Sequence, residues 1–155
     1  MIEFKRKPFD GFTHWDEKFI NLSAFIAEWS KDTNRKNGAV IVDNDNIVVS
    51  MGYNGFPRDC DDSVECRYER PDKYLFTEHA ERNALYHAAR HGVSLKECRI
   101  YMTMFPCSDC ARGIIQTGIK RIIAPKPDLK HEIWGVHFKA SIEMLEECGV
   151  EIINY

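Results

Sequence analysis

Residues 98–124, CRIYMTMFPCSDCARGIIQTGIKRIIA, decide the fold class of this protein. The apolar run 98–104 predicts a strand. A helix is expected from about Pro106, a residue suited to the first helical turn, to about Thr117. A second apolar run, 119–124, predicts another strand. The stretch is therefore expected to form a strand, a helix and a strand in succession.

The rest of the chain continues this alternation of helices and strands. Apolar residues at helical spacing mark the helices, and runs rich in valine and isoleucine mark the strands. Thr77 is expected to cap the helix that follows it, and Gly92 to end that helix. We predict a helix over 16–29, strands over 38–42 and 47–51, helices over 78–91 and 137–148, and a strand over 150–153. This order predicts an α/β fold in which helices cover both faces of one sheet.

Length and composition restrict the class of protein. The chain has 155 residues, 44% hydrophobic and 29% charged, so one domain spanning 1–155 with a core of its own is expected. The net charge is 21 − 24 = −3, which gives no electrostatic signature of binding to duplex nucleic acid. No apolar run reaches the ~20 residues of a membrane helix, and the N-terminus, MIEFKRKPFDGF, lacks the apolar stretch of a secretory signal. We therefore expect a cytoplasmic protein with no membrane partner.

The six cysteines call for metal or redox chemistry more than for disulfides. Disulfide frameworks belong to short secreted chains, whereas a close pair such as Cys107 and Cys110 in an intracellular protein indicates a metal or a redox site. The other four are expected to be small buried side chains or bystanders. Of these, Cys60 and Cys66 could bind a second ion. Both lie in 53–73, a segment rich in Gly, Pro, Asp and Arg whose length is typical of functional loops.

Cys107 and Cys110 are candidate zinc ligands. They lie three residues apart at a predicted helix start, so both sulfurs face the same side. The partial positive charge of a helix N-terminus favours the thiolate form, which is the form that binds zinc. A redox site would use the same spacing. His79 can complete a three-ligand set, which leaves the fourth tetrahedral position to water, as in catalytic zinc sites.

Glu81 is the candidate proton carrier. Residues two apart in a regular helix point in different directions, so His79 and Glu81 converge only if they straddle an irregular first turn. In that arrangement Glu81 would take a proton from water and pass it to a leaving amine, as a general base and then a general acid.

The combination His79-Ala-Glu81 with Pro106-Cys-Ser-Asp-Cys110 is the signature of zinc-dependent base deaminases. Together with the string GYNGFP at 52–57, the string HAERNA at 79–84 and the run to Ile115, it resembles the deoxycytidylate (dCMP) deaminases of the cytidine deaminase-like superfamily. The resemblance covers about residues 16–124. It implies a three-layer α/β/α fold with a mixed sheet of about five strands.

The resemblance also implies roles for individual residues. His79, Cys107 and Cys110 would bind Zn²⁺, and Glu81 would shuttle the proton in the hydrolysis of dCMP to dUMP and ammonia. Asn54 would contact the sugar, and the backbone at Ala80 would read the pyrimidine edge. Candidate partners for the phosphate are Arg35, Lys36, Arg58 and Arg112. Relatives form homo-oligomers and respond to dCTP and dTTP, and both properties are expected here.

The chain departs from the family pattern in two places. Asn37 stands before Gly38, where a valine is usual, and the segment 124–134 replaces a Ser-Asp-Lys-Tyr-like stretch near the substrate. In that segment Trp134 could stack on the substrate or fill the core. Alternative substrates are therefore cytidine, a modified dCMP or a tRNA adenosine. An idle zinc- or nucleotide-binding domain is the alternative outside enzymes.

Overall fold

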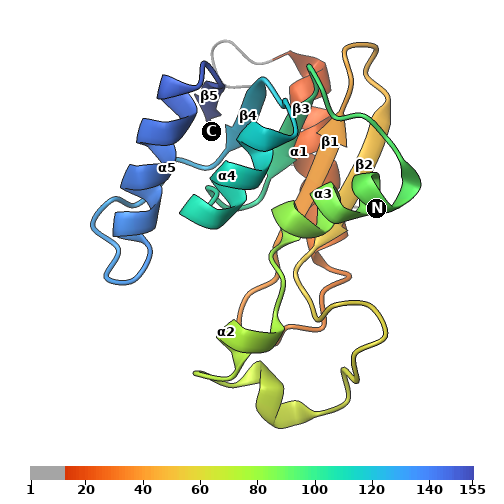
Figure 1. Cartoon of the computed structure of the whole chain (residues 1–155), viewed down its shortest axis with the longest axis vertical. Helices are drawn as coiled ribbons and strands as arrows, with labels where there is room; N and C mark the ends of the chain where they lie inside the picture. Colours follow the sequence, from red (N-terminus) through yellow and green to blue (C-terminus); the bar gives the residue numbers. More distant parts are fainter. Residues whose placement is uncertain (1–12) are drawn as a thin grey trace.

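A mixed five-stranded sheet forms the centre of the protein (Figure 1). The computed structural model describes residues 13–155. The strand order is β2-β1-β3-β4-β5, in which β1 pairs antiparallel with β2 and β3, while β3, β4 and β5 run parallel. The strands are β1 (Gly38–Val42), β2 (Val48–Tyr53), β3 (Arg99–Met102), β4 (Arg121–Ala124) and β5 (Glu151–Asn154). The predicted mixed sheet of about five strands is confirmed.

Helices cover both faces of the sheet, as predicted. Helix α1 packs on one face, while α3, α4 and α5 pack on the other. The helices are α1 (His14–Ala27), α2 (Lys73–Phe76), α3 (Ala80–His91), α4 (Ser108–Gln116) and α5 (Gly135–Glu147), with a 3₁₀ turn η1 (Glu65–Tyr68). The result is a three-layer α/β/α fold.

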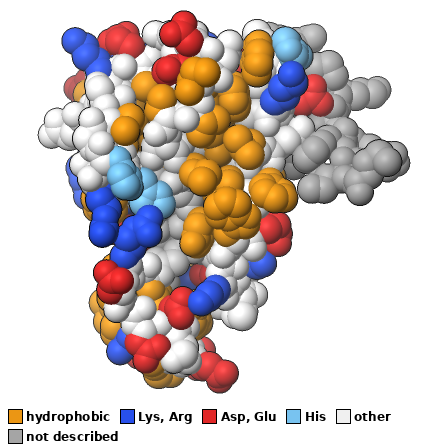
Figure 2. Space-filling model, turned by 90° about the vertical axis from the view of Figure 1, so that its right-hand side faces the viewer, with side chains coloured by type: hydrophobic (Ala, Val, Ile, Leu, Met, Phe, Trp, Pro, Cys, Tyr) orange, Lys and Arg blue, Asp and Glu red, His pale blue; other side chains and the backbone are white. Residues whose placement is uncertain are grey.

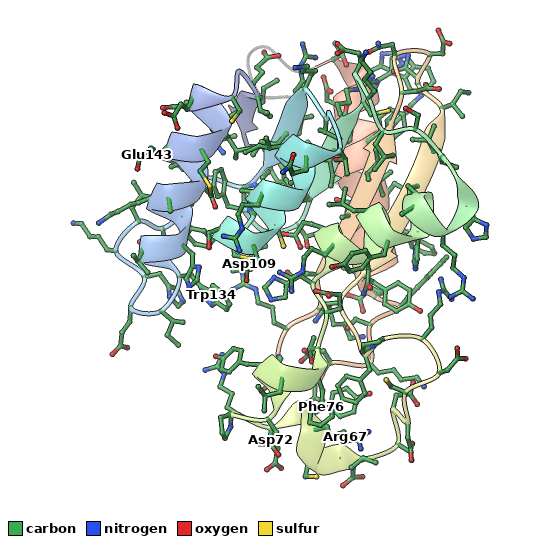
Figure 3. The ribbon with its side chains drawn as sticks, in the orientation of Figure 1. Arg67, Asp72, Phe76, Asp109, Trp134 and Glu143 are labelled. Carbon is green, nitrogen blue, oxygen red and sulfur yellow. The ribbon has the colours of Figure 1, made fainter. Side chains whose placement is uncertain are left out.

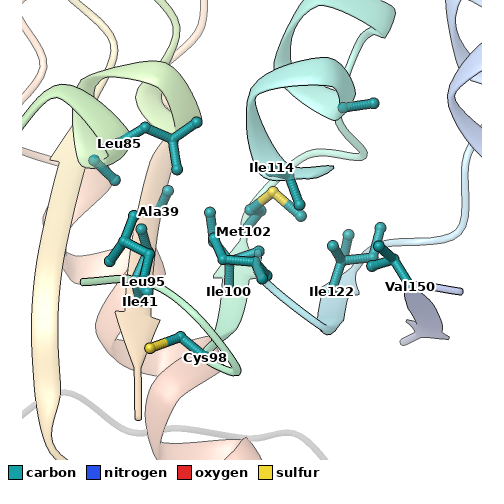
Figure 4. Packing of buried hydrophobic residues seen from close by; sticks show 14 of the residues in the cluster. Ala39, Ile41, Leu85, Leu95, Cys98, Ile100, Met102, Ile114, Ile122 and Val150 are labelled. Carbon is teal, nitrogen blue, oxygen red and sulfur yellow. The ribbon is translucent and has the colours of Figure 1, made fainter. Parts of the chain in front are cut away.

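Strand β1 shows how the two cores are divided. All five of its residues are buried, and successive side chains of a strand point to opposite faces. Ala39 and Ile41 therefore belong to the larger core, beneath α3, whereas Val40 and Val42 pack on the side of α1. Figure 4 shows the larger core, in which strand residues meet Leu85 of α3.

The start of α3 differs from the prediction in a way that matters for the site. Thr77 is not the N-cap; His79 is, with an extended backbone at φ −75° and ψ 152°. The cause is a pairing distant in sequence, since Glu78 and Gly55 exchange backbone hydrogen bonds of 2.8 and 3.1 Å. This bridge holds the chain extended through Glu78, so the helix begins at Ala80 and not at Glu78. Gly92 ends the helix in a left-handed conformation, as predicted.

The long segment after β2 contains two short helical turns, η1 and α2, where only a loop was predicted. In Figure 1 this segment projects below the sheet, on the side where α3 begins. No helix within residues 13–155 is long and apolar enough to cross a membrane. The expected absence of a secretory signal in residues 1–12 lies outside the described residues.

Candidate active site

Two helix starts bring the three predicted metal ligands together. His79 is the residue before α3, Cys107 is the residue before α4, and Cys110 lies in the first turn of α4. Both cysteine side chains are buried and His79 is partly buried. Within residues 13–155 these three form the one group of three or more His, Cys, Asp or Glu side chains able to hold a metal ion. Cys60 and Cys66, which were considered for a second ion, are therefore not part of any such group among the described residues.

The distances among the three ligand atoms suit tetrahedral zinc. Cys107 Sγ and Cys110 Sγ lie 3.6 Å apart, and His79 Nδ1 lies 3.5 Å from each sulfur. From usual zinc–ligand distances, the sulfur–sulfur edge of a tetrahedron is about 3.8 Å and the sulfur–nitrogen edge about 3.6 Å. A disulfide would need about 2.0 Å between the sulfurs, and both cysteines are free. The two sulfurs are therefore not joined in a disulfide, and with His79 as a third donor the set fits zinc.

The two sulfurs differ in their affinity for protons. The pKa of Cys107 is lowered to about 4, because it accepts a hydrogen bond from the Cys110 thiol and interacts with His79. The pKa of Cys110 is raised well above its usual value, because it donates that hydrogen bond and is buried. Burial lowers the pKa of His79, but the hydrogen bond with Cys107 and the charge of Glu81 outweigh it, and the net direction is upward.

Glu81 lies in the same cavity as His79, which resolves the geometric problem posed by their spacing. Because α3 begins at Ala80, His79 is still extended while Glu81 sits in the first helical turn. The Glu81 side chain is buried, with 6% of its surface exposed, and this burial raises its pKa. A carboxyl group with a raised pKa can accept and release a proton near neutral pH.

Arg82 joins the ligand cluster, and sequence reasoning missed it. Its Nε donates a 2.5 Å hydrogen bond to Glu78, and its Nη1 lies 3.6 Å from Asp109 and 4.0 Å from Cys110 Sγ. The guanidinium thus places positive charge beside a sulfur that would carry negative charge when it binds a metal. The one signal in the sequence was a basic residue directly after Glu81.

A cavity of 380 Å³ opens above the cluster. Its volume lies in the range of about 300–1,000 Å³ typical of small-molecule sites. Its lining residues come from segments far apart in sequence: Arg35, Asn37, Asn54, Arg70, Lys73, Tyr74, Thr77, His79, Glu81, Arg82, Met104, Phe105, Cys107, Asp109, Ile133, Trp134 and His137. In Figure 3 Asp109 and Trp134 mark the side of this region that α4 and α5 provide. The cavity therefore places polar groups and rings around the metal ligands.

Asn54 lines the cavity, but its amide is largely used by the protein. Its Oδ1 accepts a hydrogen bond from Asn37 N at 2.7 Å. Its Nδ2 donates to Asp32 Oδ2 at 3.1 Å and to the Arg35 carbonyl at 2.9 Å. An amide oxygen accepts two hydrogen bonds, so Asn54 keeps one acceptor position for a ligand.

The other predicted contacts are placed as follows. Ala80 is buried, and as the first residue of α3 its backbone N–H has no partner within the helix. Of the four candidate phosphate ligands, Arg35 lines the cavity. The remaining three do not: Lys36 pairs with Glu28, Arg58 contacts His87, and Arg112 pairs with Asp109.

Trp134 packs against the core, one of the two roles considered for it, and it also lines the cavity. Its ring lies edge-on to His79, 5.9 Å between centroids. It is therefore a wall of the site as well as a core contact.

Fold and site together define the class of protein. A histidine and two cysteines at helix starts, with a buried glutamate beside them that is not one of the three donors, are the machinery of a zinc-dependent base deaminase. Residues 13–126 match the family described as the cytidine and deoxycytidylate deaminase zinc-binding region. The chain belongs to this family, and zinc is its cofactor.

Known relatives agree with this assignment. The chain is 40% identical to an uncharacterized deaminase of the luxG 3′ region of Aliivibrio fischeri, over 89% of this chain and 91% of that protein. It is 38% identical to the deoxycytidylate deaminase of Pongo abelii, over 100% of this chain and 93% of that protein. Among solved structures, the dCMP deaminase of cyanophage S-TIM5 in complex with dCMP and dUMP has a TM-score of 0.72 at 25% identity, covering 90% of this chain and 95% of that one.

Proposed function

We propose that this protein is a hydrolase that converts dCMP to dUMP and ammonia, with zinc as its cofactor. The observation that carries the proposal is the triangle of His79, Cys107 and Cys110 sharing one cavity with the buried Glu81. Relatives named deoxycytidylate deaminase, and a similar structure that contains dCMP and dUMP, support the choice of substrate.

In the proposed reaction, zinc activates the water and Glu81 transfers the protons. When bound, zinc supplies Lewis acidity that lowers the pKa of water to about 7. Glu81 accepts the first proton that water loses as the water oxygen bonds to C4 of the cytosine ring, and passes it to N3 as the C4=N3 double bond becomes a single bond. Glu81 then takes the second proton, from the new C4 hydroxyl, and gives it to the 4-amino nitrogen as the C4–N bond breaks, C4=O forms and ammonia leaves. Burial of Glu81 favours its protonated form, which suits a group that must hold the proton between the two steps.

We propose three further contacts between the protein and the substrate. Asn54 binds the sugar only as an acceptor, because both of its N–H groups already donate to the protein. The backbone N–H of Ala80, which has no partner within α3, donates to an acceptor on the pyrimidine edge. Arg35 binds the phosphate as a guanidinium, which matches the geometry of phosphate oxygens.

The test is ammonia release by the zinc-loaded protein from dCMP, CMP, dCTP, deoxycytidine, a 5-substituted dCMP and an adenosine-containing tRNA stem-loop. We expect dCMP to be the preferred substrate. Glu81→Gln should retain zinc and lose turnover. Preference for another member of the panel would contradict the substrate, and a Glu81→Gln variant as active as the wild type would contradict the mechanism. Absence of ammonia release from every member of the panel, with zinc bound, would contradict the proposed substrate and favour either a substrate outside the panel or the idle domain.

We further propose that dCTP and dTTP act as effectors at a second cavity. This cavity has a volume of 560 Å³ and shares no lining residue with the first. It offers Arg58 and Arg90 as cations for phosphates, and Tyr86 and Phe56 as aromatic surfaces for a base. Its Glu78 also pairs with Arg82, which lines the first cavity and so provides a route between the two. Loss of the dCTP response in Arg58→Gln would support this, and an unchanged response would contradict it.

We propose that the chain forms a homo-oligomer. An exposed apolar surface formed by Phe25, Trp29 and Tyr53 supports this proposal. The ring centroids of Phe25 and Trp29 lie 6.2 Å apart, and those of Trp29 and Tyr53 lie 6.1 Å apart. These three side chains are 37–47% exposed, and Figure 2 shows hydrophobic side chains gathered on the β2 side of the molecule. Exposed aromatic clusters of this kind are typical of protein interfaces. Sedimentation of a strict monomer would contradict the proposal.

We also propose that the chain is one domain in the cytoplasm. The single sheet takes strands from Gly38 to Asn154, and α1 packs on it, which supports one domain. All six cysteines are free, which suits a reducing compartment.

A further inference from the structure

A wall of rings leads from the metal ligands to an arginine that the sequence did not mark. The ring of Trp134 lies 5.9 Å from that of His79, and the ring of Tyr74 lies 6.4 Å from Trp134. The guanidinium of Arg70 then lies 5.6 Å from the ring of Tyr74. All four residues line the same cavity. Arg70 thus lies at one end of this row of side chains, and His79 lies at the other end.

A second arginine lines the same cavity from another segment. Arg35 follows the turn before β1, and its carbonyl oxygen accepts a hydrogen bond from Asn54. Within residues 13–155 no carboxylate lies within ion-pair distance of the guanidinium of Arg35 or of Arg70. Two exposed guanidinium groups that line one cavity without an anionic partner are suited to bind an anion.

A buried ion pair holds the segment that carries Arg70. Lys73 Nζ lies 2.6 Å from Asp32 Oδ2, and the two side chains are 13% and 1% exposed. Burial raises the pKa of Asp32, but hydrogen bonds from Lys73 and from the backbone of Asn34 and Arg35 outweigh it and lower the pKa overall. Because its charge is matched by Asp32, Lys73 is a positioning residue and not a free cation.

Asp32 connects this ion pair to the rest of the site. The same Oδ2 that meets Lys73 also accepts a hydrogen bond from Asn54, and Oδ1 accepts one from the backbone N–H of Arg35 at 3.1 Å. One carboxylate therefore ties the turn of Arg35, the end of β2 and helix α2 together. In Figure 3 the α2 segment, marked by Asp72 and Phe76, lies below the side of the cavity that Trp134 marks.

We propose that Arg70 and Arg35 bind the 5′-phosphate of the substrate, and that the Asp32–Lys73 pair positions Arg70 for this contact. The inference rests on the proposed deamination of dCMP. In that nucleotide the cytosine C4 and the phosphate lie at opposite ends of the molecule. A base held beside His79 therefore extends its phosphate along the wall of rings toward Arg70. This subsite makes the enzyme select a nucleotide over a nucleoside.

The test compares dCMP with deoxycytidine in the zinc-loaded enzyme. Loss of a hydrogen-bonded charge in Arg70→Gln should raise the KM for dCMP about 10- to 100-fold. The kcat for dCMP and the kcat/KM for deoxycytidine should stay unchanged, because neither depends on a phosphate contact. Arg67→Gln is the matched control. Arg67 lies on the same segment but stacks over Phe76 at 4.6 Å and bonds to the Asp61 carbonyl, outside the cavity.

The role of Lys73 needs a readout of position. Lys73→Met should raise the KM for dCMP, and amide hydrogen exchange in 70–76 should become faster. Adding Lys73→Met to Arg70→Gln should change the KM for dCMP little further, because both act on one contact. An additive effect would overturn the positioning role.

Two results for Arg70→Gln would overturn the proposal: an unchanged KM for dCMP, or an equal loss with deoxycytidine. Binding separates this proposal from the proposed reaction. A wild-type protein that binds dCMP more tightly than deoxycytidine, with the preference lost in Arg70→Gln, supports the subsite even if it releases no ammonia. The absence of ammonia release would then count against the reaction alone.

Discussion

Gly52 sets the distance between α3 and the sheet, so Gly52→Ala should displace α3, the helix that carries Glu81. A Cβ atom at this position would lie 2.4 Å from the Ala80 carbonyl oxygen and 2.4 Å from the Ala84 backbone nitrogen. Both contacts are backbone atoms of α3, which cannot rotate away as a side chain could. To reach an ordinary contact of about 3.4 Å, the helix must move by about 1 Å.

The expected magnitudes follow from this displacement. Overpacking of a well-packed contact costs about 1–3 kcal/mol of unfolding free energy. For a chain of this length each kcal/mol lowers Tm by about 2–4 °C. Glu81 lies in the first turn of α3, so a shift of this helix by about 1 Å should also lower the kcat/KM for dCMP, by up to about 100-fold.

The assay combines thermal unfolding of the zinc-loaded protein with ammonia release. Gly55→Ala is the control, because a Cβ at Gly55 would meet nothing within 4 Å. Its free energy of unfolding should stay within about 0.5 kcal/mol of the wild type, the range of surface substitutions, and its Tm should change correspondingly little. If Gly52→Ala matches the wild type in both Tm and kcat/KM, the close approach of α3 does not control the position of Glu81, and the reasoning fails.

Three further predictions concern single side chains. The Thr77 hydroxyl is buried without a hydrogen-bond partner in the part of the chain described, so Thr77→Val should leave Tm unchanged or higher, whereas an N-cap would lose stability. Arg82→Met removes the guanidinium 4.0 Å from Cys110 and should weaken zinc retention about 10- to 100-fold in a chelator competition, whereas Arg112→Met should not. Burial raises the pKa of Asp16, but hydrogen bonds from the Tyr101 hydroxyl and from Thr13 outweigh it and lower the pKa overall. Its carboxylate therefore stabilises the fold above the unfolded pKa, and this contribution is lost as the pH falls through the folded pKa. Asp16→Asn should lower Tm at pH 7 and the difference should shrink below about pH 4, so a difference independent of pH would count against this account.

The bounds of β1 were predictable, while the start of α3 was not. The run GAVIV after the polar and charged stretch 30–37 is enough to mark a buried strand, and β1 occupies 38–42 as expected. Thr77 has the chemistry of an N-cap, but a backbone bridge between Glu78 and Gly55 outweighs that local preference. Such a bridge joins residues 23 positions apart, and no local pattern reveals it.

By itself, the sequence predicted the class of fold, the family and the three candidate zinc ligands, His79, Cys107 and Cys110. These depend on the type of residue and on short spacing, because one helical turn sets the distance between Cys107 and Cys110. Only the tertiary structure decided that His79 and Glu81 share a cavity and that Arg82 lies beside Cys110. It also decided which cationic side chains line that cavity. Each of these depends on backbone pairing or a buried ion pair between distant segments, and such contacts form only when the whole chain has packed.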